Sequence, residues 1–296
     1  MKSVPSGLAA HLAQGETTLA RCWRIVREDG AILGFTDHDR PLTVSGTICA
    51  PTAGFDAAEV PSRLGAQVET GEVLGILDSA SIAESDIAQG RYDGARVESW
   101  LVNWRTPSQA MLLRVDTIGA IVREDGLFRA ELRSPQQALN VTRGRHYHGL
   151  CDADLGDARC GINLNQSQYR GTAIVGAILD PYRLELSGIG GFAAGWFSLG
   201  HAVWTSGGRN GLRDAVVGHE RAGGTDIVVF EQRVGEWVAE GDALLVHAGC
   251  DRRFSTCRER FDNGVNFRGF PHIPGSDFVL RHPRPGDALD GRAVVP

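Results

Sequence analysis

Cysteines are the residues of this sequence best suited to chemistry, and four of the six fall in two widely separated pairs. Eight residues separate Cys151 from Cys160, and six separate Cys250 from Cys257. Both pairs lie in loop-like sequence with charged neighbours. The other two cysteines lie in apolar stretches typical of strands, at Cys22 and Cys49. Because four thiolates from two loops can enclose one metal centre, the two pairs predict a single four-cysteine site.

The spacing of these cysteines bears on what the site would hold. Zinc-binding turns usually place about two to four residues between paired cysteines, and the gaps here are roughly double that. A [4Fe–4S] cluster is larger than one zinc ion and spreads its four sulfur ligands more widely. The spacing therefore favours an iron–sulfur cluster, with zinc as the alternative.

Charged neighbours fit a cluster, because a [4Fe–4S] core with four thiolates is negative and a buried charge needs compensation. Four arginines flank the cysteines and could supply it: Arg159, Arg252, Arg253 and Arg258. His146 and His148 could in principle replace a cysteine as ligand. Loop histidines more often form simple hydrogen bonds, so the predicted ligand set contains cysteines alone.

We expect the protein to be made and folded in the bacterial cytoplasm. The N-terminal residues lack the continuous apolar segment of a signal peptide, and no run of about 18 apolar residues suggests a membrane span. A reducing compartment disfavours structural disulfides, which strengthens the reading of the cysteines as buried thiols or ligands.

Charge and motifs limit the function classes. The net charge of −6 gives no general basic surface of the kind that binds phosphates, so tight DNA binding is not expected. The sequence has none of the common motifs of metalloproteases, P-loop nucleotidases or serine hydrolases. The segment Thr36–Arg40 contains His38 between two aspartates, but no motif places a nucleophile beside it. We therefore expect a hydrogen-bonded turn there, and no enzymatic activity.

The elements that must position the cysteines are expected to be mainly β, with a few short helices. The chain has 38 glycines among 296 residues, many between short apolar runs, which is typical of turns between strands. Helical spacing appears at residues 6–14 and 82–89. Strands are expected at residues 22–27, 31–35, 42–48, 67–70, 95–104, 111–122, 127–133, 169–178, 196–204, 226–229 and 243–247.

These elements divide into three predicted regions. Residues 1–140 form a β-rich domain, and residues 168–247 form a small β-barrel or sandwich inserted between the cysteine pairs. Residues 141–167 and 248–296 form the cysteine region and a tail, rich in Pro, Gly and Arg, that is expected to wrap over other surfaces.

Several segments together resemble one protein family over essentially the full chain. They are Gly34–Arg40, Gly90–Ala95, the segment Cys151–Gly161, Gly249–Phe254 and Asn266–Gly275. In these segments the chain resembles baseplate hub proteins of siphophage tails and gene transfer agents. Its cysteine part also resembles the lambda tail-tip protein, which binds an iron–sulfur cluster.

The resemblance implies a structural tail-tip protein located in a phage-like particle. It implies a tube-like N-terminal unit, and a trimeric hub that continues the tail tube from the distal tail protein. It further implies attachment of the central fibre protein and a cell-wall peptidase, passage of DNA without specific binding, and cluster ligation by the four paired cysteines. The alternative class is a soluble iron–sulfur protein for electron transfer or redox sensing, which reversible redox chemistry at a physiological potential would reveal.

Overall fold

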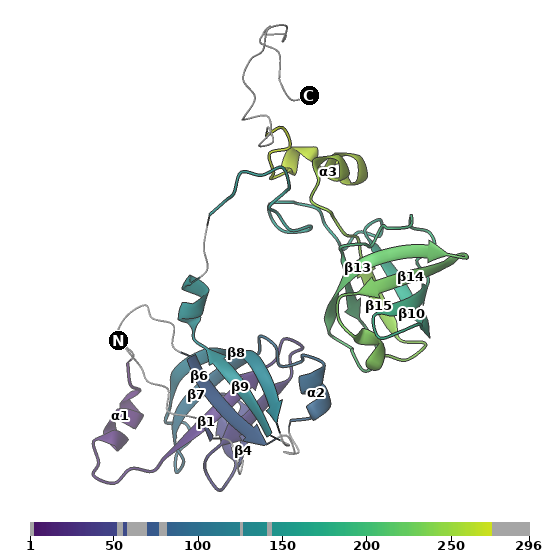
Figure 1. Ribbon diagram of the computed structural model, residues 1–296. Helices are drawn as coiled ribbons and strands as arrows, with labels where there is room; N and C mark the ends of the chain where they lie inside the picture. Colours follow the sequence, from purple (N-terminus) through teal and green to yellow (C-terminus); the bar gives the residue numbers. More distant parts are fainter. Residues whose placement is uncertain are drawn as a thin grey trace, which may run out of the picture. The chain divides into compact units, whose positions relative to one another are not determined.

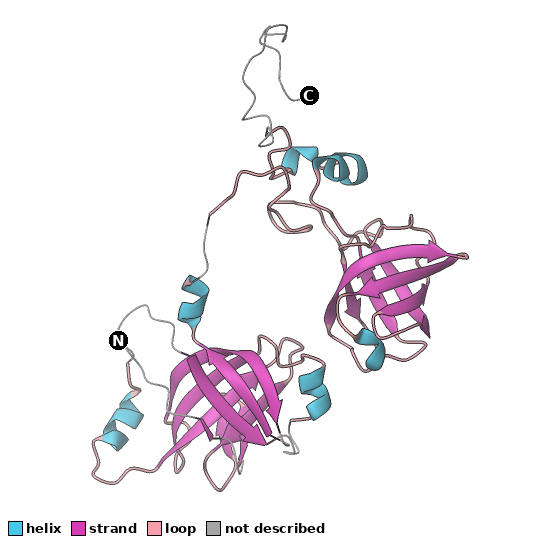
Figure 2. Cartoon of the chain, viewed as in Figure 1, coloured by secondary structure: helices cyan, strands magenta, loops and turns pink. Residues whose placement is uncertain are grey.

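The computed structural model describes residues 3–51, 56–57, 70–76, 82–124, 127–140 and 144–273. The chain forms two compact units, Met1–Thr142 and Arg143–Pro296 (Figure 1). Each unit contains its own β-sheet, and the described helices are short (Figure 2). The prediction of a mainly β protein with a few short helices is therefore confirmed. Among the described residues, no helix has the length and apolar character needed to cross a membrane.

The first unit is built on a sheet with the strand order β3-β4-β2-β1-β7-β8-β9-β6-β5. Its strands are β1 Leu19–Val26, β2 Ile32–Thr36, β3 Leu42–Val44, β4 Thr47–Pro51, β5 Asp56–Ala57, β6 Thr70–Ile76, β7 Arg96–Asn103, β8 Ala110–Glu124 and β9 Leu127–Arg133. The predicted strands at residues 22–27 and 31–35 correspond to β1 and β2, which pair antiparallel around a turn in which Gly30 has φ of 86°. The β2 and β4 strands pair in parallel.

The prediction of a single strand over residues 42–48 is wrong. The segment contains β3 and the start of β4, which pair antiparallel with Leu42 opposite Cys49. Ser45 and Gly46 both have positive φ, 48° and 77°, and this left-handed turn reverses the chain. The apolar pattern continues through the turn, so it does not reveal the break.

A polar network fixes the short helix α2 (Glu84–Ala88) against the first sheet. Arg27, at the end of β1, donates a hydrogen bond to Asp86 at 2.7 Å and pairs with Asp29. The Arg27 guanidinium lies over the ring of Tyr92, 5.1 Å from its centroid, and Tyr92 is buried in the core. The Gly90–Gly94 segment is thus a turn that packs its tyrosine. The helix at the N-terminus, α1 (Ser6–Leu12), buries Leu8.

The second unit contains a closed barrel with the strand order β10-β11-β14-β13-β12-β15. Its strands are β10 Arg170–Ile178, β11 Arg183–Ser187, β12 His201–Trp204, β13 Arg213–Ala222, β14 Thr225–Phe230 and β15 Ala243–His247. Closure pairs β10 with β15 and leaves no free sheet edge, so the inserted β region is a barrel rather than a sandwich. Alternate strand residues fill its interior with apolar side chains, among them Trp204 and Phe230, and Phe197 joins them from a turn.

The predicted strand over residues 196–204 begins only at His201. Before it, the chain makes consecutive turns, in which the Trp196 N–H bonds to the Ala193 carbonyl and the Gly200 N–H to the Phe197 carbonyl. Trp196 and Phe197 still pack against or within the core, which explains their strand-like apolar pattern.

The cysteine segments lie outside the barrel strands. Residues 144–169 form turns without a helix or strand, and the chain after β15 enters the helix α3 (Phe254–Phe261) and a single turn, η3 (Gly264–Asn266). Two further single turns are η1 (Pro135–Leu139) and η2 (Val234–Glu236). The predicted wrapping of the C-terminal tail concerns mainly residues 274–296, which lie outside the described residues.

Candidate metal centre

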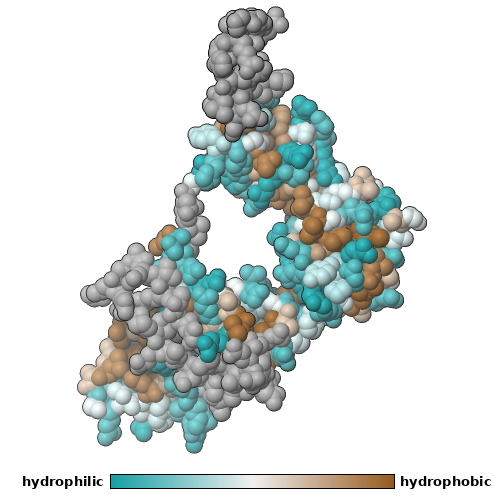
Figure 3. All heavy atoms as spheres, in the orientation of Figure 1, coloured by the Kyte–Doolittle hydropathy of each residue, from teal (hydrophilic) through white to brown (hydrophobic). Residues whose placement is uncertain are grey.

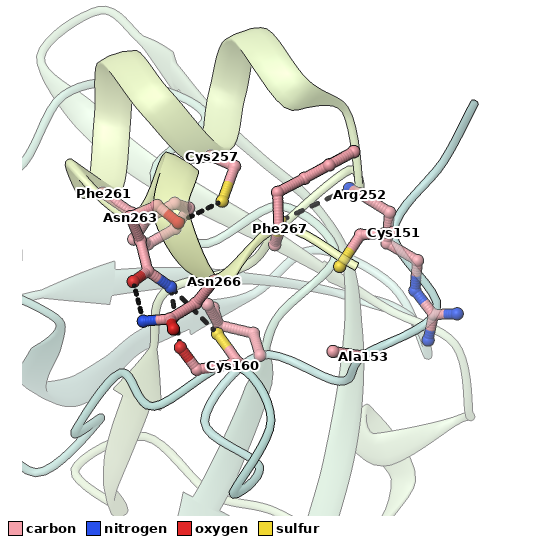
Figure 4. A pocket seen from close by; sticks show the side chains of 11 residues that line it. Cys151, Ala153, Cys160, Arg252, Cys257, Phe261, Asn263, Asn266 and Phe267 are labelled. Carbon is pink, nitrogen blue, oxygen red and sulfur yellow. Dashed lines mark hydrogen bonds between the residues drawn. The ribbon is translucent and has the colours of Figure 1, made fainter. Parts of the chain in front are cut away.

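The four cysteines of the two pairs line one cavity in the second unit, although about 90 residues separate the pairs in the chain. The cavity measures about 340 Å³ together with its opening to solvent. Figure 4 shows the sulfurs of Cys151, Cys160 and Cys257 among the lining side chains. The complete lining is Cys151, Ala153, Leu155, Cys160, Cys250, Arg252, Cys257, Phe261, Asn263, Asn266 and Phe267.

Two backbone N–H groups point at cysteine sulfurs in this cavity. The Arg252 N–H donates to the Cys250 sulfur at 3.3 Å, and the Arg268 N–H donates to the Cys151 sulfur at 3.4 Å. Arg252 has a positive φ of 63°, so the turn after Cys250 is a tight one. Donors of this kind stabilise negative charge on sulfur, which suits thiolate ligands.

The other two sulfurs contact one residue, Asn263. Its side-chain Nδ2 lies 3.6 Å from the Cys160 sulfur, and its backbone carbonyl accepts from the Cys257 thiol at 3.3 Å. Asn263 was not among the predicted site residues. The sequence feature that could have marked it is an asparagine just beyond the helix that carries Cys257. Many helices end near an asparagine, so this feature is not specific.

In the free protein two of the thiols hold their protons more firmly than an ordinary cysteine. Burial, together with the charges of the neighbouring cysteines, raises the pKa of Cys257 to about 11. Burial also raises the pKa of Cys250, while the Arg252 N–H acts in the opposite direction. Four thiols in one cavity cannot all ionise together at low cost, and a bound cation would offset the charge of the thiolates.

Apolar packing holds the cysteine region on its own barrel. Phe261, at the end of α3, packs against Tyr169 and Trp196, with ring centroids 5.7 Å and 6.1 Å away. Arg260 lies over the Trp196 ring at 4.4 Å and donates to the Gly195 carbonyl at 2.9 Å. These contacts orient α3, and therefore Cys257, relative to the strand that precedes Cys250.

The four flanking arginines place less positive charge beside the cysteine sulfurs than their positions in the sequence suggest. Arg252 lines the cavity and pairs with Asp154, but Arg253 and Arg258 are largely exposed. Arg159 pairs with Asp152 and Asp157 on the loop that carries Cys160. The polar groups that reach the sulfurs are N–H donors, and the spacing of residues in the sequence cannot locate them.

The remaining residues considered as sites lie elsewhere. Neither His146 nor His148 lines the cavity, and the His148 ring accepts the Leu150 N–H at 3.2 Å. Cys22 and Cys49 lie fully buried in the first unit, as their apolar surroundings predicted. All six cysteines are free thiols.

The Thr36–Arg40 segment forms the predicted hydrogen-bonded turn. Asp37 accepts the Arg21 N–H at 2.7 Å, and Nδ1 of His38 accepts the Arg40 N–H at 3.0 Å. The His38 ring lies 5.1 Å from the ring of Trp104. Both the aspartate and the imidazole are thus engaged in holding the local backbone.

The donor atoms that line the cavity limit which group it could hold. Within the described residues, no three His, Cys, Asp or Glu side chains are placed so that they could hold a metal ion. Yet four thiols share one cavity whose lining includes no carboxylate. Thiolate-only ligation is the donor set of iron–sulfur clusters and of structural zinc. This donor set fits a cluster and a zinc ion alike.

Comparison with known proteins gives matches over both units. Residues 5–163 match the family model described as the baseplate hub protein, N-terminal attachment domain. Residues 195–277 match the phage conserved hypothetical protein BR0599 family. One cysteine pair falls within each match. No curated protein matches the chain.

A solved structure also resembles the whole chain. A protein in the structure of the virion of a native gene transfer agent particle is 41% identical, with a TM-score of 0.89, and the alignment covers 97% of this chain and 99% of that one. The fold and the matches define the class, a structural protein of a phage-like tail tip. The chain belongs to the baseplate hub protein family. The predicted location in a phage-like particle is confirmed at this level.

Proposed function

We propose that this baseplate hub protein holds a structural [4Fe–4S] cluster on Cys151, Cys160, Cys250 and Cys257. The observation that carries the proposal is the convergence of the four thiols on one cavity from two distant segments. The backbone N–H groups that donate to the Cys250 and Cys151 sulfurs support it. Zinc is the alternative occupant.

The cluster acts as a clasp. One ligand pair precedes the barrel and the other follows it, so a bound cluster closes a loop of about 90 residues, which in chain-entropy terms stabilises the fold by about 4–5 kcal/mol. The barrel is thereby fixed to α3 by covalent ligation in addition to the packing of Phe261.

In the particle, the protein continues the tail tube as a trimer below the distal tail protein. It carries the central fibre and a separate cell-wall peptidase, while DNA passes through without specific binding. Membership of the hub family and the similarity to a gene transfer agent virion protein support this role. The net charge of −6 suits a surface that does not retain phosphates.

The test is metal analysis and absorption spectroscopy of anaerobically purified protein. We expect about four irons per chain and a broad absorbance near ~400 nm. Replacing any one of the four ligand cysteines by serine should abolish the absorbance and lower the melting temperature. The matched controls Cys22→Ser and Cys49→Ser should keep the absorbance.

Stoichiometric zinc without iron would leave the four-cysteine site standing and refute the cluster. Full stability of the single ligand variants would refute the clasp. Reversible reduction at a physiological potential, in a chain that does not enter particles, would instead favour the soluble electron-transfer alternative.

A further inference from the structure

Asn263 is a buried polar residue placed between the two ligand segments. It follows α3 directly after Asp262, which has a left-handed φ of 47°, and it is only 7% exposed. Its Nδ2 donates to the Cys160 carbonyl at 2.7 Å and lies 3.6 Å from the Cys160 sulfur. Its backbone N–H bonds to the Cys257 carbonyl, and its own carbonyl accepts the Cys257 thiol. One residue thus contacts a ligand from each pair.

The orientation of the Asn263 amide is fixed by a second asparagine. Nδ2 of Asn266, in η3, donates to Oδ1 of Asn263 at 2.8 Å. Because the Cys160 carbonyl can only accept, Nδ2 of Asn263 must face Cys160, and Asn266 then holds Oδ1 on the opposite side. The relay from Asn266 through Asn263 to the sulfur is visible as dashed lines in Figure 4.

We propose that Asn263 is a positioning residue that raises the reduction potential of the cluster by donating an N–H to the Cys160 sulfur. The inference rests on the cluster proposed above. Reduction adds one electron, much of whose charge reaches the ligand sulfurs. An N–H donor therefore stabilises the reduced form more than the oxidised form, and burial strengthens the effect. Among the described residues, Asn263 supplies the side-chain N–H that reaches a cysteine sulfur of this cavity.

Asn263 is the donor to a cysteine sulfur that a substitution can test, because the donors to the Cys250 and Cys151 sulfurs are backbone groups. The N–H groups of Arg252 and Arg268 remain whatever side chain is present, whereas the Asn263 donor can be removed by substitution. Asn263→Leu keeps a side chain of similar size and removes the donor. Asn263→Asp keeps the shape, removes the donor and adds a negative charge near the sulfur.

The experiment is a redox titration of the holoprotein with dithionite as electron donor, followed by electron paramagnetic resonance. Both variants should keep wild-type iron content, and both should have a more negative potential, with Asn263→Asp shifted further. Asn266→Ala, which frees the amide to rotate, should shift the potential in the same direction by less. Asn165→Asp adds the same charge at an exposed site on the Cys160 loop, outside the cavity lining, and should leave the potential unchanged.

A wild-type potential in Asn263→Leu with full iron content would overturn the inference and leave the cluster intact. If Asn263→Leu does not hold iron, Asn266→Ala decides, and an unshifted potential there would overturn the inference. If the wild-type protein contained no iron, both the proposed cluster and the inference about Asn263 would be refuted. Iron analysis of the wild-type protein shows this before any variant is made.

Discussion

At the scale of single residues, a buried ion pair stabilises the loop between β12 and β13. Arg209 donates two hydrogen bonds to Asp214, at 2.9 Å and 2.7 Å, and the indole N–H of Trp204 donates to the same carboxylate at 2.6 Å. The side chains of Arg209 and Asp214 are only 4% and 2% exposed. Each charged side chain needs the opposite charge of its partner for stabilisation, because neither is accessible to water.

We expect Arg209→Met to destabilise the second unit by about 3–5 kcal/mol, because it leaves the Asp214 carboxylate buried without its cation. Urea unfolding followed by tryptophan fluorescence measures the change. The matched control is Arg233→Met, whose ion pair with Glu236 in the same unit is 59% and 42% exposed. It should cost at most about 1 kcal/mol. Equal losses in both variants would contradict the assignment.

Two stacked histidines on β12 and β15 make the stability of the barrel depend on pH. The rings of His201 and His247 lie 4.4 Å apart, with an angle of 9° between them. Burial, followed by the charges of Arg213 and His247, lowers the pKa of His201 to about 4. Burial also lowers the pKa of His247, and the charges of Arg170 and Arg213 act in the same direction. A hydrogen bond with the Leu164 backbone partly opposes this shift.

Because the folded pKa values lie below the unfolded value of about 6.5, the unfolded chain binds more protons in this window. Stability is therefore complete above about pH 6.5 and falls as the pH is lowered toward about 4. Each pH unit weakens folding by up to about 1.4 kcal/mol per histidine, less to the extent that the rings reach solvent. Unfolding free energies measured between pH 7 and 5 should show a smaller slope in His201→Gln. An unchanged slope would contradict this origin.

At the scale of elements, the chain just after β15 passes so close to the turn at residues 198–200 that only glycine fits at position 249. A Cβ at Gly249 would lie 1.9 Å from the Ser198 carbonyl oxygen and 2.4 Å from the Gly200 nitrogen. Both contacts are with backbone, which cannot move aside cheaply. This approach sets the exit of the chain from β15, one residue before Cys250.

Gly249→Ala should therefore displace the backbone that carries Cys250, with a loss of about 1–3 kcal/mol of stability and a lower iron content. Melting temperature and iron analysis of the same preparations measure both effects. Gly191→Ala is the control, since a Cβ there has nothing within 4 Å. A loss of stability with unchanged iron content would show that the strand exit does not position the ligand.

At the scale of the whole molecule, the surface drawn in Figure 3 mixes hydrophilic and hydrophobic side chains. Large apolar side chains exposed by more than half belong to both units, at Ile48, Leu139, Tyr147, Leu199, Val217 and Val265. Such residues tolerate burial in contacts with other subunits. Assembly into a closed ring would bring identical surfaces of successive copies into identical contacts.

We expect electron microscopy of particles containing this protein to show three copies around the tail axis, while the isolated chain can remain monomeric. Removal of the ligand cysteines should reduce incorporation into particles, because the packing of Phe261 alone would then hold α3 on the barrel. The core variant Cys22→Ser is the matched control. A different rotational symmetry for this component would contradict the trimer.

The sequence by itself determined the β-rich class, the two cysteine pairs and the family, because short apolar runs, glycine turns and motif spacing are local properties. It located β9 and β15 to the residue, since β15 is a short apolar run, β9 alternates apolar and charged residues, and turn residues bound both. It missed the turn at Ser45 and Gly46 and the turns before His201, because side chains in a turn can be as buried as those in a strand.

Only the tertiary structure decided how the cysteine pairs meet. Barrel closure brings the exit of β15 beside the loop that precedes β10, and the packing of Phe261 on Trp196 and Tyr169 orients α3. Asn263 is a sequence neighbour of Cys257, but it reaches Cys160 through a hydrogen bond between residues 103 positions apart. Such contacts follow from the packing of distant segments, and no local pattern in the sequence encodes them.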